Sequence, residues 1–156
     1  MALEDDMALL SRVSVFAGMD RDALRLLAFS AEMRHLRAGD TLFHKGELSD
    51  GGFVIVKGTI AMVEDDRRAA DAVVGPGTLI GEVALISETK RPATAVAREP
   101  TTVLRLSRAM FRRTLEEYPQ LAGRLASELR QRVKSMSKDL SEVKSVLNPG
   151  ERQGSK

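Results

Sequence analysis

The stretch that decides the fold is LIGEVALISETKRPATA, residues 79–95. Near its start Gly81 allows the backbone to turn tightly, and an acidic residue, Glu82, follows at once. The next few residues are apolar and can form one turn of helix. Arg91 comes nine positions after Glu82. The stretch therefore combines a carboxylate, a short helical turn and a guanidinium.

These residue types suit the binding of a sugar phosphate. The free N–H groups at the start of a short helix near Glu82 attract an anion, and the Arg91 guanidinium can donate to two of its oxygens at once. An ionised Glu82 does not bind that anion, but it accepts hydrogen bonds from a neighbouring hydroxyl. A second interpretation stays open from the residue types alone. Glu82 and Arg91 can form an ordinary ion pair at the rim of a β structure, where it contributes little to stability.

Short β-rich runs surround this stretch between Met33 and Ser107. Several of them alternate between two faces, and turn residues separate them. The turn clusters are Ala38-Gly39-Asp40, Lys45-Gly46-Glu47, Ser49-Asp50-Gly51-Gly52, Lys57-Gly58, Glu64-Asp65-Asp66 and Gly75-Pro76-Gly77. Seven or eight short strands favour a closed or two-sheet β roll over an open sheet, because closure leaves fewer exposed edges.

Helical patterns flank the β region. Asp20 precedes apolar residues at helical spacing, which predicts one short helix that opens the chain. After Ser107 the helical period returns and predicts a helix that ends near Pro119. A longer helix is expected from Gln120 to Leu147. Apolar residues recur along it at alternating steps of three and four, at Ala122, Ala126, Leu129, Val133, Met136, Leu140, Val143 and Leu147. This heptad seam favours pairing with a second copy, and packing within one chain is the alternative.

One part of the stretch at residues 79–95 resembles the phosphate-binding cassette of the cyclic nucleotide-binding domain family. The matching residues are Gly81-Glu82-Val83-Ala84-Leu85, followed by Arg91-Pro92-Ala93-Thr94. The family includes the catabolite activator protein, the regulatory subunit of protein kinase A and cyclic nucleotide-gated channels. The resemblance covers roughly residues 14–145. Supporting matches are Phe16-Ala17-Gly18-Met19, Gly39-Asp40, Gly46-Glu47, Gly58, Phe111 and Pro119.

The resemblance implies a mainly β fold. We expect an eight-stranded β roll, a double-stranded β-helix of jelly-roll type, with an N-terminal helix and two C-terminal helices. Residues 1–147 would form a single cyclic nucleotide-binding domain. Its parts would be an N-terminal helical segment at 1–30, the roll at 31–107 and the C-terminal helices at 108–147, and a flexible tail would follow at 148–156.

The resemblance also implies a role for each residue of the cassette. Glu82 would accept a hydrogen bond from the ribose 2′-hydroxyl, and Arg91 would bind the cyclic phosphate. The main-chain amides of Gly81, Glu82 and Ala84 would line the pocket. The implied ligand-binding residues are Gly81, Glu82, Val83, Ala84, Arg91, Pro92, Ala93, Met136 and Ser137.

Three of these positions carry alternatives. Pro92 departs from the family pattern because it has neither an N–H nor a hydroxyl. One phosphate donor is therefore missing unless Ala93 or a water replaces it, and the absent hydroxyl argues mildly against guanine, so cyclic AMP is favoured over cyclic GMP. Met136 and Ser137 match positions that contact the base in the family. Their alternatives are packing on the seam for Met136 and a solvated hydroxyl for Ser137.

Composition excludes several other classes. The chain has no cysteine, which excludes disulfides, thiolate zinc sites, iron–sulfur clusters and cysteine nucleophiles, and is compatible with a reducing cytosol. The acidic start shows no signal peptide, and no apolar run approaches the roughly 18 residues that a membrane helix needs. We expect a cytoplasmic location and no membrane segment. Acidic residues interrupt the basic C-terminal third, and no recognition element follows Leu147, so we expect no DNA binding.

These observations predict a stand-alone regulatory module without cofactor or catalytic activity. It would bind a cyclic nucleotide, pair as a homodimer through the long helix, and transmit binding to an unknown downstream protein through movement of its C-terminal helices. The alternative is a non-enzymatic dimeric scaffold of the same fold with a degenerate pocket, of which Pro92 would be the sign. A cupin-like metal enzyme is a third possibility, but His35 and His44 are the only histidines and such a site usually needs a further ligand.

Overall fold

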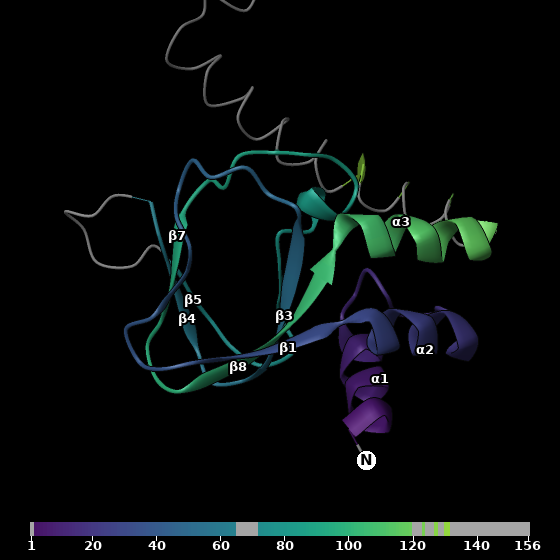
Figure 1. The fold of residues 1–156 in the computed structure, drawn as a ribbon, viewed down its shortest axis with the longest axis horizontal. Helices are drawn as coiled ribbons and strands as arrows, with labels where there is room; N and C mark the ends of the chain where they lie inside the picture. The colour runs from purple at the N-terminus through teal and green to yellow at the C-terminus, as the bar shows by residue number, and fades with distance from the viewer. Residues whose placement is uncertain (1, 65–71, 120–122, 124–126, 128–129, 132–156) are drawn as a thin grey trace, which may run out of the picture.

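A β roll of two four-stranded antiparallel sheets forms the centre of the computed structural model, and the helices lie together at one side of it (Figure 1). The structure describes residues 2–64, 72–119, 123, 127, 130 and 131. The first sheet has the order β1 (Glu32–Leu36), β8 (Thr101–Ser107), β3 (Gly51–Lys57) and β6 (Leu79–Ile80). The second has the order β2 (Thr41–Phe43), β7 (Thr94–Ala97), β4 (Ile60–Val63) and β5 (Ala72–Val74). This confirms the predicted eight-stranded roll.

The first sheet is covered on both faces, because successive side chains of a strand point to opposite sides. Val54 on β3 and Leu104 on β8 are partners in register and pack against the helices. Their neighbours Phe53 and Ile55 on β3 and Val103 on β8 point the other way, into the core between the two sheets. The inner face of β3 and β8 therefore lines the interior of the roll.

The described α-helices share one hydrophobic core with the outer face of the first sheet; they are α1 (Ala2–Arg12), α2 (Arg21–Ser30) and α3 (Arg108–Glu117). The predicted N-terminal helix is α2, which begins after Asp20, although the Asp20 side chain makes no capping hydrogen bond. The expectation of a single helix before the β region was wrong, because α1 precedes it. Met7 and Leu10 lie on one face of α1 and are buried, so α1 is held by packing on the rest of the domain.

The helix α3 follows β8 directly, as expected. The Ser107 hydroxyl accepts a hydrogen bond from the main-chain N–H of Met110 at 3.1 Å and caps the helix. The helix ends at Glu117, two residues before Pro119. The long helix predicted for Gln120 to Leu147 lies outside the described residues except for positions 123, 127, 130 and 131, and so does the tail at 148–156. Within the described ranges, no helix has both the length and the apolar character that a membrane span requires.

Candidate functional site

The cassette of residues 79–95 leaves the first sheet and enters the second. β6 ends at Ile80, Gly81 follows with a φ of +87°, and Val83–Leu85 form a short 3-10 helix, η1. The main-chain N–H of Leu85 donates to the carbonyl of Glu82 at 3.2 Å, which closes the turn. The helical turn that the sequence predicts after Gly81 is therefore present, and β7 begins at Thr94.

Main-chain hydrogen bonds hold Arg91 against the loop that precedes β3. Its N–H donates to the carbonyl of Glu47 at 2.8 Å, and its own carbonyl accepts from the N–H of Gly46 at 2.8 Å. Two residues earlier, the carbonyl of Thr89 accepts from the N–H of Ser49 at 2.8 Å. These bonds fix the Arg91 backbone in space.

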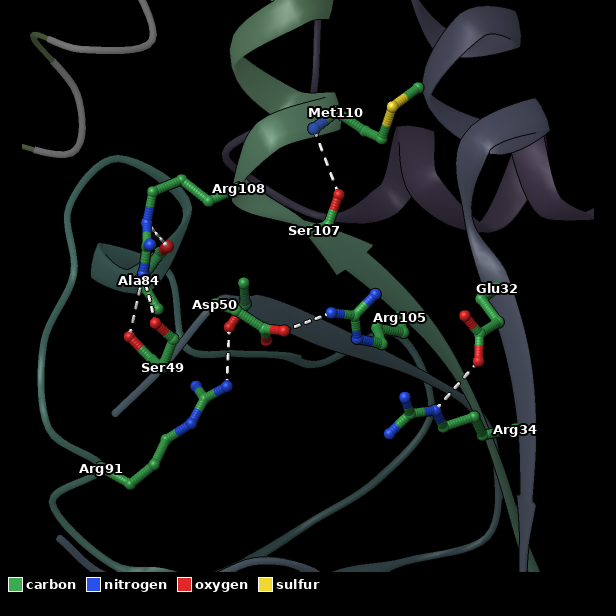
Figure 2. Close-up of polar contacts among 11 residues, drawn as sticks. Glu32, Arg34, Ser49, Asp50, Ala84, Arg91, Arg105, Ser107, Arg108 and Met110 are labelled. Atoms are coloured by element: carbon green, nitrogen blue, oxygen red, sulfur yellow. Dashed lines mark hydrogen bonds and ion pairs between the residues drawn. The ribbon is translucent and has the colours of Figure 1, made fainter. Parts of the chain in front are cut away.

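The Arg91 side chain points into the roll and is buried, with 6% of its surface exposed. Nη2 donates to the main-chain carbonyl of Gly51 at 2.9 Å, as the dashed line from Arg91 in Figure 2 shows. The guanidinium carbon lies 4.3 Å from the centre of the Phe43 ring and 5.6 Å from that of Phe53. Cation–π attraction of this kind contributes about 0.5–2 kcal/mol and holds the guanidinium over the two rings.

Electrostatically, Arg91 is a desolvated cation without a bonded carboxylate. Burial lowers the pKa of Arg91, with Asp50 and Glu47 raising it and Arg108 and Arg105 lowering it further. Among the residues with described positions, no carboxylate forms an ion pair with Arg91, and Asp50 pairs with Arg105 instead. Every buried side-chain nitrogen or oxygen in that part of the chain has a partner, so the guanidinium nitrogens without an acceptor reach solvent. Such a cation is suited to receive an anion.

Gly81 and the turn after it face this guanidinium. A Cβ on Gly81 would lie 2.7 Å from Arg91 Nη1, so the guanidinium could not keep this position beside a larger residue. The main-chain N–H groups of Val83 and Ala84 have no acceptor among the residues that the structure describes. Glu82 is half-buried at the start of the turn. The interpretation of Glu82 and Arg91 as an exposed ion pair is wrong, because Arg91 is buried and bonds to Gly51.

The other predicted positions divide into two groups. Pro92 is exposed and Ala93 is buried, directly beside Arg91 in the chain. Met136 and Ser137 lie outside the described residues, so the structure does not place them.

Three residues that contact Arg91 were not predicted: Gly51, Phe43 and Phe53. The Gly51 contact is through a main-chain carbonyl, which every residue carries, so residue type gives no signal. The two phenylalanines belong to short apolar strand runs, which give no sign of a ligand site. Their placement in the buried cluster between the two sheets, where the Arg91 side chain also lies, is visible only in the folded structure.

The two histidines do not meet in a metal site. Both are exposed, and Nδ1 of His35 lies 3.1 Å from the Thr102 hydroxyl. No group of three or more potential metal ligands occurs among the side chains that the structure describes. A cupin-like centre therefore receives no support from this part of the chain.

Comparison with known proteins agrees with this geometry. Residues 33–118 match the family model described as the cyclic nucleotide-binding domain. A cyclic nucleotide-binding-like protein from Brucella abortus is 46% identical, with a TM-score of 0.66, over 72% of this chain and 98% of that one. The cAMP-dependent protein kinase regulatory subunit of Eremothecium gossypii is 33% identical over 65% of this chain and 22% of its own length. The lysophospholipase NTE1 of Chaetomium globosum is 27% identical over 72% of this chain and only 8% of its own length. Because the family model covers more than half of the sequence, the chain belongs to the cyclic nucleotide-binding domain family.

Proposed function

We propose that this chain is a regulatory module that binds a cyclic nucleotide through Arg91, with cyclic AMP preferred over cyclic GMP, and that it has no catalytic activity of its own. The observation that carries the proposal is the buried Arg91 guanidinium. It has no ion-pair partner among the described residues and lies against Gly81 at the start of a helical turn. Membership of the family supports the ligand class. The module would work in the cytoplasm, with which a chain without cysteine is compatible.

In the proposed complex the anionic phosphate replaces water at the guanidinium. Arg91 would donate from the nitrogens that are not bonded to Gly51, and the N–H groups of Val83 and Ala84, which have no acceptor among the described residues, would donate to the same anion. Pro92 supplies no N–H, so the buried Ala93 is the nearest residue after Arg91 that can donate from its main chain. The absence of a hydroxyl at position 92 removes a contact available to guanine, which favours adenine.

Titration calorimetry of the full chain tests this function. Cyclic AMP should give a saturable heat with one site per chain, and cyclic GMP should bind more weakly. If neither nucleotide gives a heat or displaces a bound nucleotide from the purified protein, the alternative of a scaffold with a degenerate pocket replaces the proposal.

Glu82 is proposed to accept a hydrogen bond from the ribose 2′-hydroxyl. A hydrogen bond to a charged group contributes about 1.5–3 kcal/mol, so Glu82→Ala should weaken cyclic AMP binding about ten- to hundredfold. The same substitution should change the affinity for 2′-deoxy cyclic AMP only slightly, because that ligand lacks the hydroxyl. Glu88→Ala is the control, since Glu88 is an exposed carboxylate of the same cassette. An equal loss for both ligands would contradict the ribose role of Glu82.

We also propose that the seam of residues 122–147 joins two copies and that movement of the C-terminal helices carries the signal to a downstream protein. All eight apolar residues of the seam lie outside the described residues, so the support is the heptad spacing in the sequence. Sedimentation velocity should show a dimer for the wild type and a monomer for Leu140→Lys, which places a charge in the seam. A wild type that sediments as a monomer at all concentrations removes this part of the proposal.

A further inference from the structure

Arg108, the first residue of α3, holds three segments together. Its Nε donates to the carbonyl of Ala84 in η1 at 2.9 Å, and its Nη2 donates to the carbonyl of Ser49 at 2.6 Å (Figure 2). The same Nη2 lies 3.2 Å from the Ser49 hydroxyl, and the main-chain N–H of Arg108 donates to the carbonyl of Asp50 at 2.6 Å. One side chain thus connects α3 with both the cassette and the loop before β3.

The two acceptors of Arg108 belong to the two segments that contact Arg91, the cassette and the loop before β3. Ala84 belongs to the turn that follows Gly81, and a cation at its carbonyl stabilises the C-terminal end of that turn. Ser49 is buried, and its hydroxyl accepts a hydrogen bond from the main-chain N–H of Thr89 at 3.1 Å. Ser49 therefore also holds the part of the cassette that follows η1. Gly51, two residues after Ser49, supplies the carbonyl that binds Arg91.

A lysine in place of Arg108 would not reproduce these contacts. The guanidinium uses two different nitrogens for acceptors on two separate segments, while an ammonium is a single point of donation. An alanine would remove both contacts but keep the main-chain bond to Asp50, so α3 would stay attached to the loop before β3. The side chain can therefore be tested without detaching the helix.

We propose that Arg108 is a positioning residue that couples the ordering of the cassette turn to the ordering of the first turn of α3. The inference rests on the proposed function where it concerns nucleotide. An anion that orders η1 strengthens the bond from Arg108 to Ala84, and α3 is then held more firmly. Because coupling is reciprocal, an ordered α3 must tighten nucleotide binding by the same factor as bound nucleotide favours the ordered α3, and loss of the bond removes both effects.

The test compares Arg108→Ala and Arg108→Lys with Arg112→Ala, which removes an exposed arginine one turn later on α3. Arg108→Ala should weaken cyclic AMP binding about tenfold, within the range typical of coupled sites, and Arg108→Lys should recover only part of it. Arg112→Ala should bind as the wild type does. Thermal unfolding of all three variants shows whether the fold is retained.

Amide hydrogen exchange separates positioning from a general structural role. Without ligand, Arg108→Ala should accelerate exchange at Leu85 and Ile86 in the cassette and at Phe111 in α3 together, and Arg112→Ala should not. Cyclic AMP should slow exchange in both segments of the wild type but only in the cassette of Arg108→Ala. Wild-type affinity in Arg108→Ala, or faster exchange in only one segment or in neither, would overturn the inference. If the wild type binds neither cyclic nucleotide, the proposed function fails, and the ligand-free exchange alone decides the role of Arg108.

Discussion

Replacing Arg91 with alanine should weaken cyclic AMP binding about ten- to several-hundredfold, because each charge-assisted hydrogen bond to the phosphate contributes about 1.5–3 kcal/mol. From the surroundings of Arg91 we also expect that the substitution lowers the free energy of unfolding much less than it lowers the free energy of binding. Burial already lowers the pKa of Arg91, which means that the fold disfavours its charge, and its side chain donates one hydrogen bond to the described residues, to the Gly51 carbonyl. Removing the cation therefore relieves desolvation while it vacates the space over Phe43 and leaves the Gly51 carbonyl without a donor.

The matched control for this prediction is Arg98→Ala. Arg98 is exposed, and its main-chain N–H donates to the carbonyl of Thr59, a bond that the substitution retains. Calorimetry should give wild-type affinity for Arg98→Ala, and thermal unfolding should give similar midpoints for both variants. Arg91→Lys should bind more weakly than the wild type, since an ammonium cannot donate to two phosphate oxygens in a fixed fork. A cyclic AMP affinity unchanged in Arg91→Ala would contradict the assigned phosphate site.

The parts of the site that the sequence predicts are the ones that lie close together in the chain. Gly81, the helical turn after it and Arg91 occupy a single stretch, and each residue type there is chosen by a local requirement: a positive φ, a short turn, a cation. The strands were predicted for the same reason, because turn clusters such as Gly39-Asp40 and Gly46-Glu47 separate short apolar runs. Local requirements of this kind can be recognised in the sequence without knowing the tertiary contacts between the elements.

Contacts that come from far along the chain carry no such signal. Arg91 contacts the carbonyl of Gly51 and the ring of Phe43, which belong to separate strands. Arg108 contacts the cassette because it directly follows β8, and the position of β8 in the sheet places it there. A main-chain acceptor has no residue type, so only the folded register reveals it. α1 was missed for a related reason: its stability comes from the packing of buried residues such as Leu10.

Gly81 should be the cassette position least tolerant of a methyl group. Its φ of +87° lies in the left-handed region, where a residue with a Cβ costs about 1–2 kcal/mol. In addition, the methyl of an alanine would lie 2.7 Å from Nη1 of Arg91, closer than a real Cβ contact allows. The guanidinium would have to move away from its position over Phe43. Gly81→Ala should therefore affect both stability and the proposed phosphate site.

Gly77→Ala separates these two effects, because Gly77 has a φ of +85° and nothing within 4 Å of its would-be Cβ. It carries the backbone penalty alone. Both variants should lower the free energy of unfolding by about 1–2 kcal/mol or more in denaturant titrations, while only Gly81→Ala should also weaken cyclic AMP binding, about tenfold or more for the displacement of one charge-assisted donor. Equal nucleotide affinities in the two variants would show that Arg91 tolerates the displacement, and its close approach to Gly81 would then have no part in holding the phosphate.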